Sequence, residues 1–288
     1  MIRTDRLLRT AGERLAVAGT ASPAAEARSL LGHVLDVSPA GVFLVREVGP
    51  EAAERFLELV ERRAAGEPVQ HITGRAYFRH VEVAVGPGVF VPRPETEVMT
   101  GWVIERARGL DHPVIVELCA GSGVISLAIR DECPHAEVHA VELSEDAVAW
   151  AQRNLSGSGV DLRAGDMADA FPDLDGRVDL VVANPPYVPL EAWASVAPDV
   201  RDHDPDLALW SGDDGLDATR VVARVAARLL RPGGWVASEH AEVQHASAPG
   251  VFVATGMFDR VGDQPDLTGR PRFVVARRGT RAAGGMAG

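Results

Sequence analysis

Residues 114–123 read Val114-Ile115-Val116-Glu117-Leu118-Cys119-Ala120-Gly121-Ser122-Gly123. The first five residues have the apolar character of a buried strand, although one of them is acidic. The last five form a turn rich in glycine, and residues 124–130 have the spacing of a helix. A strand, a glycine-rich turn and a helix in this order are typical of a sheet whose strands run parallel.

The same alternation of strand and helix continues toward the C-terminus. It predicts helices at residues 145–155 and 215–230, and strands at residues 137–141, 161–164, 178–183 and 235–240. Two final strands, residues 251–253 and 273–276, are expected to form an antiparallel hairpin at the sheet edge. We therefore expect an α/β fold with a Rossmann-like sheet, and ligands at the carboxyl ends of its strands.

The glycine-rich turn is compatible with two classes of cofactor-binding sheet. In both the NAD-binding and the S-adenosylmethionine-binding class, an acidic residue about 20 positions later takes the ribose hydroxyls, and Glu142 stands there. A dinucleotide site favours Gly or Ala at the position of Ser126, because its helix approaches a pyrophosphate closely. Glu117 can face an ammonium or sulfonium cation. The turn therefore favours S-adenosylmethionine.

Asn184-Pro185-Pro186-Tyr187 follows the predicted strand 178–183 and ends it, because proline cannot continue a ladder of hydrogen bonds. The two prolines lack N–H groups, so the segment is stiff and rich in backbone acceptors. The Asn184 side chain adds one acceptor and two donors, and Tyr187 adds an aromatic face. Such a ledge suits the NH2 group of a planar amide or exocyclic amine, and the alternative is a plain strand-ending turn.

The segments on either side of this sheet have other patterns. Residues 4–66 show helical spacing, which predicts four or five helices. Residues 77–85 alternate as a strand, Gly86-Pro87-Gly88 is typical of a turn, and residues 89–91 would return as the second strand of a β-hairpin. Between residues 188 and 206 we expect a loop or lid with solvated acidic side chains, namely Asp199, Asp202, Asp204 and Asp206.

Composition narrows the possible partners. The formal net charge of -12 gives no general attraction to phosphate backbones, so no direct contact with nucleic acid is expected. The two cysteines, Cys119 and Cys133, form neither a disulfide framework nor a metal-ligand spacing, and no metal is expected. The charged N-terminus is unlike a signal peptide, and no run approaches the ~20 apolar residues that span a bilayer. We expect a soluble, cytoplasmic protein without a membrane partner.

The motifs, in their order along the chain, resemble those of the protein-(glutamine-N5) methyltransferases that modify peptide chain release factors. The likeness covers nearly the whole chain, whereas Asn-Pro-Pro-Tyr by itself also occurs in adenine and cytosine amino-methyltransferases. It rests on Gln70-His71-Ile72-Thr73-Gly74, Phe90-Val91-Pro92-Arg93-Pro94-Glu95-Thr96-Glu97, Glu117 to Gly123, Asn184-Pro185-Pro186-Tyr187, Asp202-His203-Asp204-Pro205 with Gly212 to Gly215, and Gly269-Arg270-Pro271-Arg272.

The resemblance implies a class I S-adenosylmethionine-dependent methyltransferase with a small all-α N-terminal domain and a β-hairpin linker. The implied parts are a helical substrate-recognition domain at residues 1–72, the linker at 73–95, the methyltransferase domain at 96–278 and a disordered tail at 279–288. The implied substrate is the glutamine of the Gly-Gly-Gln motif in class I release factors. S-adenosylhomocysteine would be the second product.

The resemblance also implies the site residues. Those around the cofactor would be Glu117, Cys119, Ala120, Gly121, Ser122, Gly123, Glu142, Asp166, Met167 and Asn184. Those that hold the glutamine would be Asn184, Pro185, Pro186 and Tyr187, with Asn184, Pro185 and Tyr187 as catalytic residues. This chain departs from the family in three places. Glu117 replaces the usual Asp, Cys119-Ala120 replaces the commoner Gly-Thr, and Met167 stands where an aromatic residue can stack on adenine.

An amide nitrogen is a poor nucleophile, because its lone pair is delocalised into the carbonyl. We expect the Asn184 side-chain oxygen and the Pro185 carbonyl to accept the two amide hydrogens and to aim the nitrogen at the methyl group, without a strong base. Three alternatives stay open on the sequence. They are methylation of a ribosomal-protein glutamine, methylation of adenine N6 in a nucleic acid, and noncatalytic binding of S-adenosylmethionine.

Overall fold

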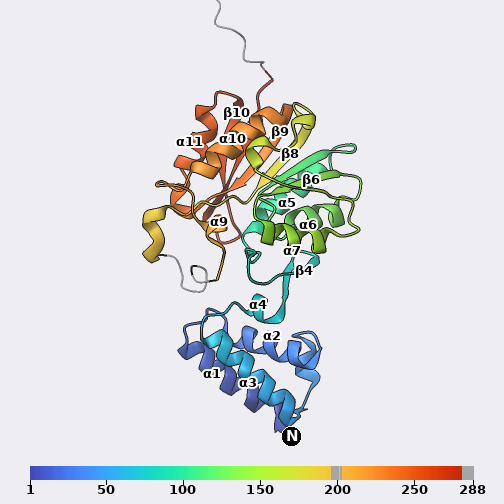
Figure 1. Ribbon diagram of the computed structural model, residues 1–288, viewed down its shortest axis with the longest axis vertical. Coiled ribbons are helices and arrows are strands. Elements are labelled where there is room, and N and C mark those ends of the chain that lie inside the picture. The colour runs from blue at the N-terminus through green and yellow to red at the C-terminus, as the bar shows by residue number, and fades with distance from the viewer. Residues whose placement is uncertain (196–200, 202, 281–288) are drawn as a thin grey trace, which may run out of the picture. The chain divides into compact units, whose positions relative to one another are not determined.

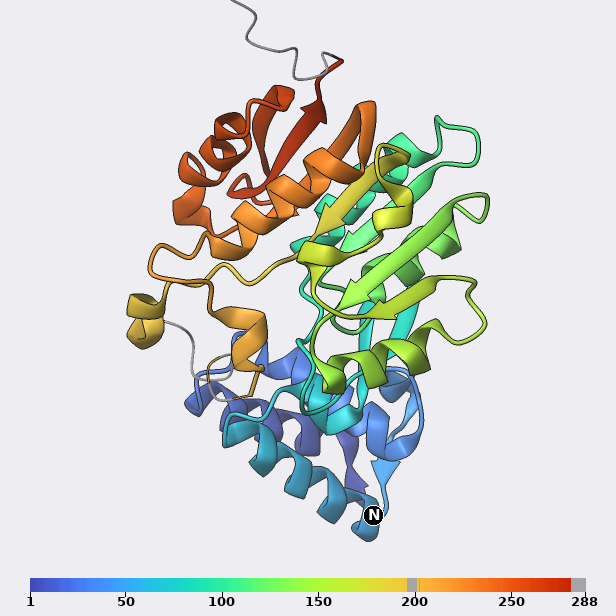
Figure 2. The ribbon, with the colours of Figure 1, turned by 45° about the horizontal axis from the view of Figure 1, so that its top comes forward.

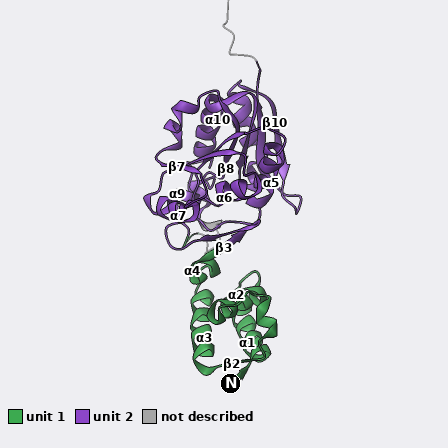
Figure 3. Ribbon diagram, turned by 90° about the vertical axis from the view of Figure 1, so that its right-hand side faces the viewer, with its two compact units in different colours: residues 1–75, 197–203 green, residues 76–196, 204–288 purple. Residues whose placement is uncertain are grey.

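The computed structural model describes residues 1–195, 201 and 203–280, and the chain divides into two compact units. The first unit comprises residues 1–75 with 197–203, and the second comprises residues 76–196 with 204–288 (Figure 3). Asp199, Asp202 and most of the expected tail, residues 281–288, lie outside the described residues. Gly279, at the start of that tail, still donates a backbone hydrogen bond to Met257, at 2.9 Å.

The first unit is helical, and its apolar faces share one core around Leu15, Leu30 and Phe56. Two helices begin at prolines, which suit the first turn because they have no N–H to leave unpaired. Residues 41–44 form a 3-10 turn, and a pair of two-residue strands was not expected from the sequence. The elements are β1 (Ile2–Arg3), α1 (Thr4–Val17), α2 (Pro23–Leu35), η1 (Gly41–Leu44), β2 (Glu47–Val48), α3 (Pro50–Ala64) and α4 (Val69–Thr73).

The linker hairpin turns earlier than the sequence predicts. Its strands are β3 (Arg75–Phe78) and β4 (Val81–Ala84), which pair with each other. A turn does form at residues 87–88, but the prediction that it joins the hairpin strands, with residues 89–91 as the second strand, is wrong. The chain reverses at Arg79, whose φ of +51° is unusual for a side chain other than glycine. The Arg79 guanidinium holds this conformation through Glu132 Oε1, at 2.5 Å, and the Glu97 carbonyl, at 3.2 Å. Contacts with residues so distant in the sequence cannot be predicted from the local alternation of apolar and polar residues.

The second unit is built on a seven-stranded sheet in the order β10-β11-β9-β8-β5-β6-β7 (Figure 1). The two neighbours of β5, β6 and β8, run parallel to it, whereas β11 is antiparallel to both β9 and β10. The strands are β5 (Val114–Leu118), β6 (Glu137–Glu142), β7 (Asp161–Ala164), β8 (Val178–Ala183), β9 (Leu230–Glu239), β10 (Phe258–Pro265) and β11 (Pro271–Arg278).

Helices cover both faces of this sheet, which gives three layers (Figure 2). One face packs against α5 (Thr96–Ala107), α6 (Val124–Glu132) and α7 (Glu145–Leu155), and the other against α10 (Asp217–Leu229) and α11 (Ser247–Ala254). Residues 180–183 of β8 are all apolar because Leu180 and Val182 face the layer of α5, α6 and α7 while Val181 and Ala183 face the layer of α10 and α11. Among the described residues, no helix is long and apolar enough to cross a membrane.

The C-terminal strands differ from the prediction. Residues 251–253 belong to helix α11, and the partner of β11 is β10, which begins at Phe258. Phe252 is fully buried while Val253 is 61% exposed, so only part of the apolar run faces the core. A run of three apolar residues is too short to separate helix from strand. Strand β10 was missed because it is an edge strand with polar side chains.

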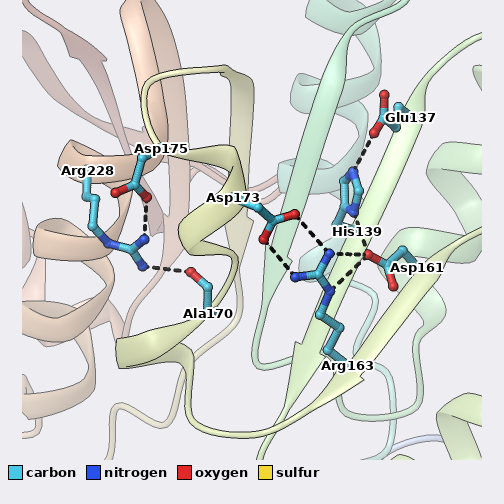
Figure 4. A network of polar contacts seen from close by, with 8 residues as sticks. All are labelled: Glu137, His139, Asp161, Arg163, Ala170, Asp173, Asp175 and Arg228. Carbon is cyan, nitrogen blue, oxygen red and sulfur yellow. Dashed lines mark hydrogen bonds and ion pairs between the residues drawn. The ribbon is translucent and has the colours of Figure 1, made fainter.

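A network of charged side chains lies at the other edge of the seven-stranded sheet, at β7 (Figure 4). Arg163 of β7 donates to Asp161 Oδ2 at 3.0 Å and to Asp173 Oδ1 at 2.9 Å. His139 of β6 lies 2.9 Å from Asp161 and 2.9 Å from Glu137. These contacts attach β7 to its neighbouring strand and to the turn at residues 172–174, and they lie at a strand edge that has no further strand to pair with among the described residues.

Candidate functional site

The register of the sheet brings the predicted residues together at the carboxyl ends of β5, β6 and β8. Leu118 of β5 pairs with Val141 on one side and with Ala183 on the other. One residue further along, Cys119 follows β5, Glu142 ends β6 and Asn184 follows β8, so these three residues lie side by side. From β5 the chain first adds strands on one side, β6 and β7, and then on the other side, beginning with β8. Open α/β sheets bind their ligands at such a reversal of strand order.

Glu117 is a buried acid whose two oxygens have different surroundings. Its Oε2 accepts hydrogen bonds from the backbone N–H of Ser126, at 2.9 Å, and from the Ser126 hydroxyl. Its Oε1 is buried without a hydrogen-bond partner among the described residues. Burial raises the pKa of Glu117 to about 8. A cation that reaches Oε1 would favour the ionised form.

The glycine-rich turn leaves open space beside this acid. Gly121 has a φ of +54°, and a Cβ at this position would meet no atom within 4 Å. Gly123, by contrast, has a φ of +77°, and a Cβ there would lie 2.9 Å from the Leu155 side chain of α7, so this glycine serves helix packing. Cys119 also has a positive φ, +60°, which is strained for a residue with a side chain. Ala120 and Ser122 are buried.

Two further acids lie at the ends of the neighbouring strands. The Glu142 carboxylate is oriented by two backbone N–H groups, from Gly121 at 2.7 Å and from Ser144 at 2.8 Å. Asp166 is exposed after β7 and accepts from the Ala168 N–H at 2.8 Å. Carboxylates that are fixed in this way can still accept hydrogen bonds from vicinal hydroxyl groups, because each oxygen has a second lone pair.

Met167 lies against the turn. Its sulfur is 3.5 Å from the Cys119 sulfur, and the side chain packs on the core of the layer of α10 and α11. Burial raises the pKa of the Cys119 thiol, so this thiol is protonated at neutral pH. The two sulfur atoms form a polarisable, weakly polar surface on which a flat ring can pack.

Asn184 stands at the end of β8 with its amide fixed on one side only. Its Nδ2 lies 3.4 Å from the Thr96 hydroxyl, and no described group donates to its Oδ1. Pro185 is buried, while Asn184 and Pro186 are partly exposed. The side-chain oxygen of Asn184 is therefore available as an acceptor.

Tyr187 is held at both its ends. Its hydroxyl lies 3.2 Å from Glu239 Oε1, and its backbone carbonyl accepts from the Gln244 amide at 3.0 Å. A Cβ on Gly215 would meet that same carbonyl at 2.5 Å, so the turn at Gly215 requires glycine on steric grounds as well as for its φ of +73°. The aromatic ring is thereby fixed beside the Asn-Pro-Pro ledge.

Sequence reasoning missed the residues behind this ledge. Glu239, the last residue of β9, accepts from the Thr96 hydroxyl at 2.7 Å. Glu239 could have been found, because it ends the strand next to β8 and the strand-end rule applies to it as well. Thr96 lies in the Pro-Glu-Thr-Glu motif, but nothing local marks its contact with a residue 143 positions away.

Asn154 is a third missed residue. Its Nδ2 donates to the Ala84 carbonyl of β4 and to the Ser122 carbonyl of the glycine-rich turn, both at 2.9 Å. Its Oδ1 accepts from the Ala84 N–H at 2.8 Å. One side chain on α7 therefore joins the linker hairpin to the turn.

The expectation that the acids after Tyr187 are solvated is wrong for Asp204. Its side chain is fully buried and forms an ion pair of 2.6 Å with Arg93, whose guanidinium stacks 5.0 Å from the Phe90 ring centroid. Asp206 is exposed, as expected, and accepts from the Trp210 indole at 2.9 Å. Among the described residues, no group of three or more His, Cys, Asp or Glu side chains is placed to hold a metal ion.

The strand order and the acids at the strand ends define a Rossmann-like methyltransferase of class I. A methyltransferase small domain model matches residues 82–197. The hMettl16 catalytic domain, solved with the MAT2A 3′UTR hairpin 6, has the same fold, with a TM-score of 0.56 at 12% identity over 84% of this chain and 86% of that one.

The N-terminal unit narrows the class to a family. A model described as the PrmC N-terminal domain matches residues 6–74. The chain is 54% identical to the release factor glutamine methyltransferase of Streptomyces coelicolor, over 93% of this chain and 95% of that relative, and 43% identical to that of Mycolicibacterium smegmatis, over 98% and 100%. The chain belongs to the release factor glutamine methyltransferase family.

A further relative carries a different name. The 4-amino-L-phenylalanine/4-methylamino-L-phenylalanine methyltransferase of Streptomyces pristinaespiralis is 44% identical over 88% of each chain. An enzyme with this degree of similarity is thus named for an aromatic amine instead of an amide.

Proposed function

We propose that this enzyme transfers a methyl group from S-adenosylmethionine to the side-chain amide nitrogen of the glutamine in the Gly-Gly-Gln motif of class I release factors. The observation that carries the proposal is the available Oδ1 of Asn184, beside a buried acid whose Oε1 has no partner among the described residues. An acceptor for an NH2 group and a carboxylate for a positive charge then lie on adjacent strands. The names of the two release factor relatives support the same substrate.

The residues at the strand ends fit the proposed cofactor. Glu117 offers its Oε1 to a cationic group, Gly121 leaves room for close approach, and Glu142 presents a fixed carboxylate to a ribose diol. Asp166 and Met167 would contact the adenine end, together with the partly buried Cys119. When bound, S-adenosylmethionine supplies an electrophilic methyl group and leaves as S-adenosylhomocysteine.

The ledge orients the nucleophile. Asn184 Oδ1 and the Pro185 carbonyl accept the two amide hydrogens of the glutamine, so the nitrogen lone pair points toward the methyl group. Pro186 keeps the backbone stiff, and the Tyr187 ring covers the amide plane and excludes water. The amide nitrogen bears positive charge after the methyl transfer, so one of its N–H protons becomes acidic and passes to solvent. The proposed reaction therefore needs no strong base and no metal.

We also propose that residues 1–72 recognise the release factor, that residues 73–95 link this domain to the methyltransferase domain at 96–278, and that the protein works in the cytoplasm. The match of residues 6–74 to a domain model of the same family supports the role of the helical part. The net charge of -12 opposes nucleic acid as the substrate.

A second candidate substrate is a small aromatic amine, which the Streptomyces pristinaespiralis relative favours. An aryl NH2 group presents the same two hydrogens to the ledge, and its ring can pack on Tyr187. The higher identity and coverage of the release factor relative favour the glutamine.

The test is a parallel incubation of the purified protein and S-adenosylmethionine with three acceptors, followed by mass spectrometry. The acceptors are an unmodified release factor, 4-amino-L-phenylalanine and a DNA duplex that contains adenine. We expect one added methyl on the Gly-Gly-Gln glutamine, and none on a release factor in which that glutamine is alanine. Methylation of the aryl amine or of adenine alone would overturn the proposal.

A further inference from the structure

A chain of hydrogen bonds runs from the methyl-acceptor ledge into the protein. The Asn184 Nδ2 lies 3.4 Å from Thr96 Oγ1, and the Thr96 hydroxyl donates to Glu239 Oε2 at 2.7 Å. The Tyr187 hydroxyl donates to the other oxygen, Glu239 Oε1, at 3.2 Å. Three separate elements, α5, β9 and the segment after β8, thus meet at one carboxylate.

The direction of each hydrogen bond follows from the chemistry of Glu239. An ionised carboxylate only accepts, so the single proton of the Thr96 hydroxyl is committed to it. The Thr96 oxygen can then only accept from Asn184. Asn184 must turn its NH2 group toward Thr96, which leaves Oδ1 facing the ledge. The two ends of an Asn amide are nearly equal in shape, so such a partner is needed to choose between them.

We propose that Glu239, through Thr96, is a positioning residue that determines which end of the Asn184 amide faces the methyl acceptor. The inference rests on the proposed function, because it requires an acceptor with an NH2 group. With the amide reversed, Asn184 would present donors to the NH2 group of the substrate, and the nitrogen would lose one of its two acceptors.

The surroundings of Glu239 make this control sensitive to protonation. The side chain is 2% exposed, and burial raises the pKa of Glu239 to about 7. Arg272 of β11 and the hydroxyls of Thr96 and Tyr187 oppose this rise, while Glu95 at the start of α5 adds to it. A protonated Glu239 can itself donate to Thr96, and the Thr96 hydroxyl is then free to donate to Asn184 Oδ1. Activity should therefore fall as the pH drops through about 7.

The experiment compares four variants with the wild-type enzyme on a release factor, at saturating S-adenosylmethionine. Thr96→Val removes the hydroxyl at nearly constant volume, and Thr96→Ser keeps it. Glu239→Gln removes the titration. Thr100→Val is the matched control, because this buried hydroxyl lies one turn further along α5 and donates to the Thr96 carbonyl, at 3.0 Å, instead of to the Thr96 side chain. The readouts are kcat and KM between pH 5.5 and 8.5, and the Kd of S-adenosylmethionine.

We expect Thr96→Val to lower kcat by about 10–100-fold, since one oriented acceptor of the transition state is lost, with cofactor Kd changed less than about 3-fold. Thr96→Ser and Thr100→Val should keep wild-type kcat within the same factor. The wild-type decline of kcat below about pH 7 should be absent in Glu239→Gln. A merely structural role would not remove a pH-dependent limb.

Wild-type kcat in Thr96→Val, or the same pH limb in Glu239→Gln, would overturn the inference. If Glu239→Gln fails to fold, the comparison of Thr96→Val with Thr96→Ser decides alone. A wild-type enzyme that methylates the aryl amine instead would refute the proposed substrate, and the same variants are then compared on that NH2 group.

Discussion

Replacement of Glu117 by glutamine tests whether the burial of this acid lowers the stability of the folded protein when the carboxyl group is ionised. The ordinary pKa of the side chain is 4.5, and burial raises it to about 8. Between these values the folded protein binds a proton that the unfolded chain has released, so the folded state of the wild type loses stability as the pH rises through this window.

The size of the effect follows from the shift. One pKa unit corresponds to about 1.4 kcal/mol, so the wild type should lose roughly 4 kcal/mol between pH 5 and pH 8.5 relative to Glu117→Gln. The variant also places an NH2 group where Oε1 has no partner among the described residues, which costs about 1–3 kcal/mol at every pH. We therefore expect the variant to be no more stable than the wild type at pH 5, and more stable at pH 8.5.

Urea denaturation of the ligand-free protein measures this difference. All five tryptophans lie at residues 102–235, within the second unit, so their fluorescence reports on the unit that contains Glu117. Glu105→Gln, at an exposed acid on α5, is the control and should show no such pH trend. Titration calorimetry on the same samples should show S-adenosylmethionine bound about 10–100-fold more weakly by Glu117→Gln. A stability difference that is constant with pH would refute the argument from burial.

Three further changes test other parts of the site. Asn184→Ala should lower kcat by about 10²–10³-fold while the cofactor Kd changes less than about 3-fold, and undiminished turnover would contradict the role of the ledge. Gly215→Ala should cost about 2 kcal/mol or more in urea denaturation, because its Cβ would meet the Tyr187 carbonyl; an unchanged midpoint would show that this turn adapts. Asp204→Ala should cost about 2–4 kcal/mol in the same assay, because it deprives Arg93 of a buried partner, and a loss below about 0.5 kcal/mol would mean that the pair is exposed in solution.

The central strands could be predicted from sequence because each signal there is local. Buried parallel strands are short, mainly apolar runs, as at 114–118 and 178–183, and the second run ends at Asn184-Pro185-Pro186, which cannot continue a ladder. Helix 145–155 begins directly after Ser144, whose hydroxyl accepts from Ala147. Where a residue's conformation depends on distant partners, as at Arg79, the local pattern misled.

The candidate site likewise contains residues that could be predicted from local sequence and contacts that could not. Glu117, Glu142 and Asn184 are placed at strand ends by a rule that needs only the strands themselves. Ser126 marks a departure from the dinucleotide fingerprint in the sequence, whereas its contact with Glu117 emerges only in the folded chain. Asn184 and Glu239 could be placed side by side only once the register of β8 against β9 was known, because that register is set by packing of the whole sheet. The contact between Thr96 of α5 and Glu239 likewise depends on tertiary packing.

The hydrogen bonds between the Asn154 side chain and the Ala84 backbone have a consequence for synthesis on the ribosome. The backbone of Ala84 is held by a side chain 70 residues downstream, so the linker hairpin leaves the ribosome long before its anchor exists. At roughly 5–20 residues per second, the delay is about 4–14 s. During that interval the helical N-terminal part can fold, while the linker stays undocked until helix α7 has emerged.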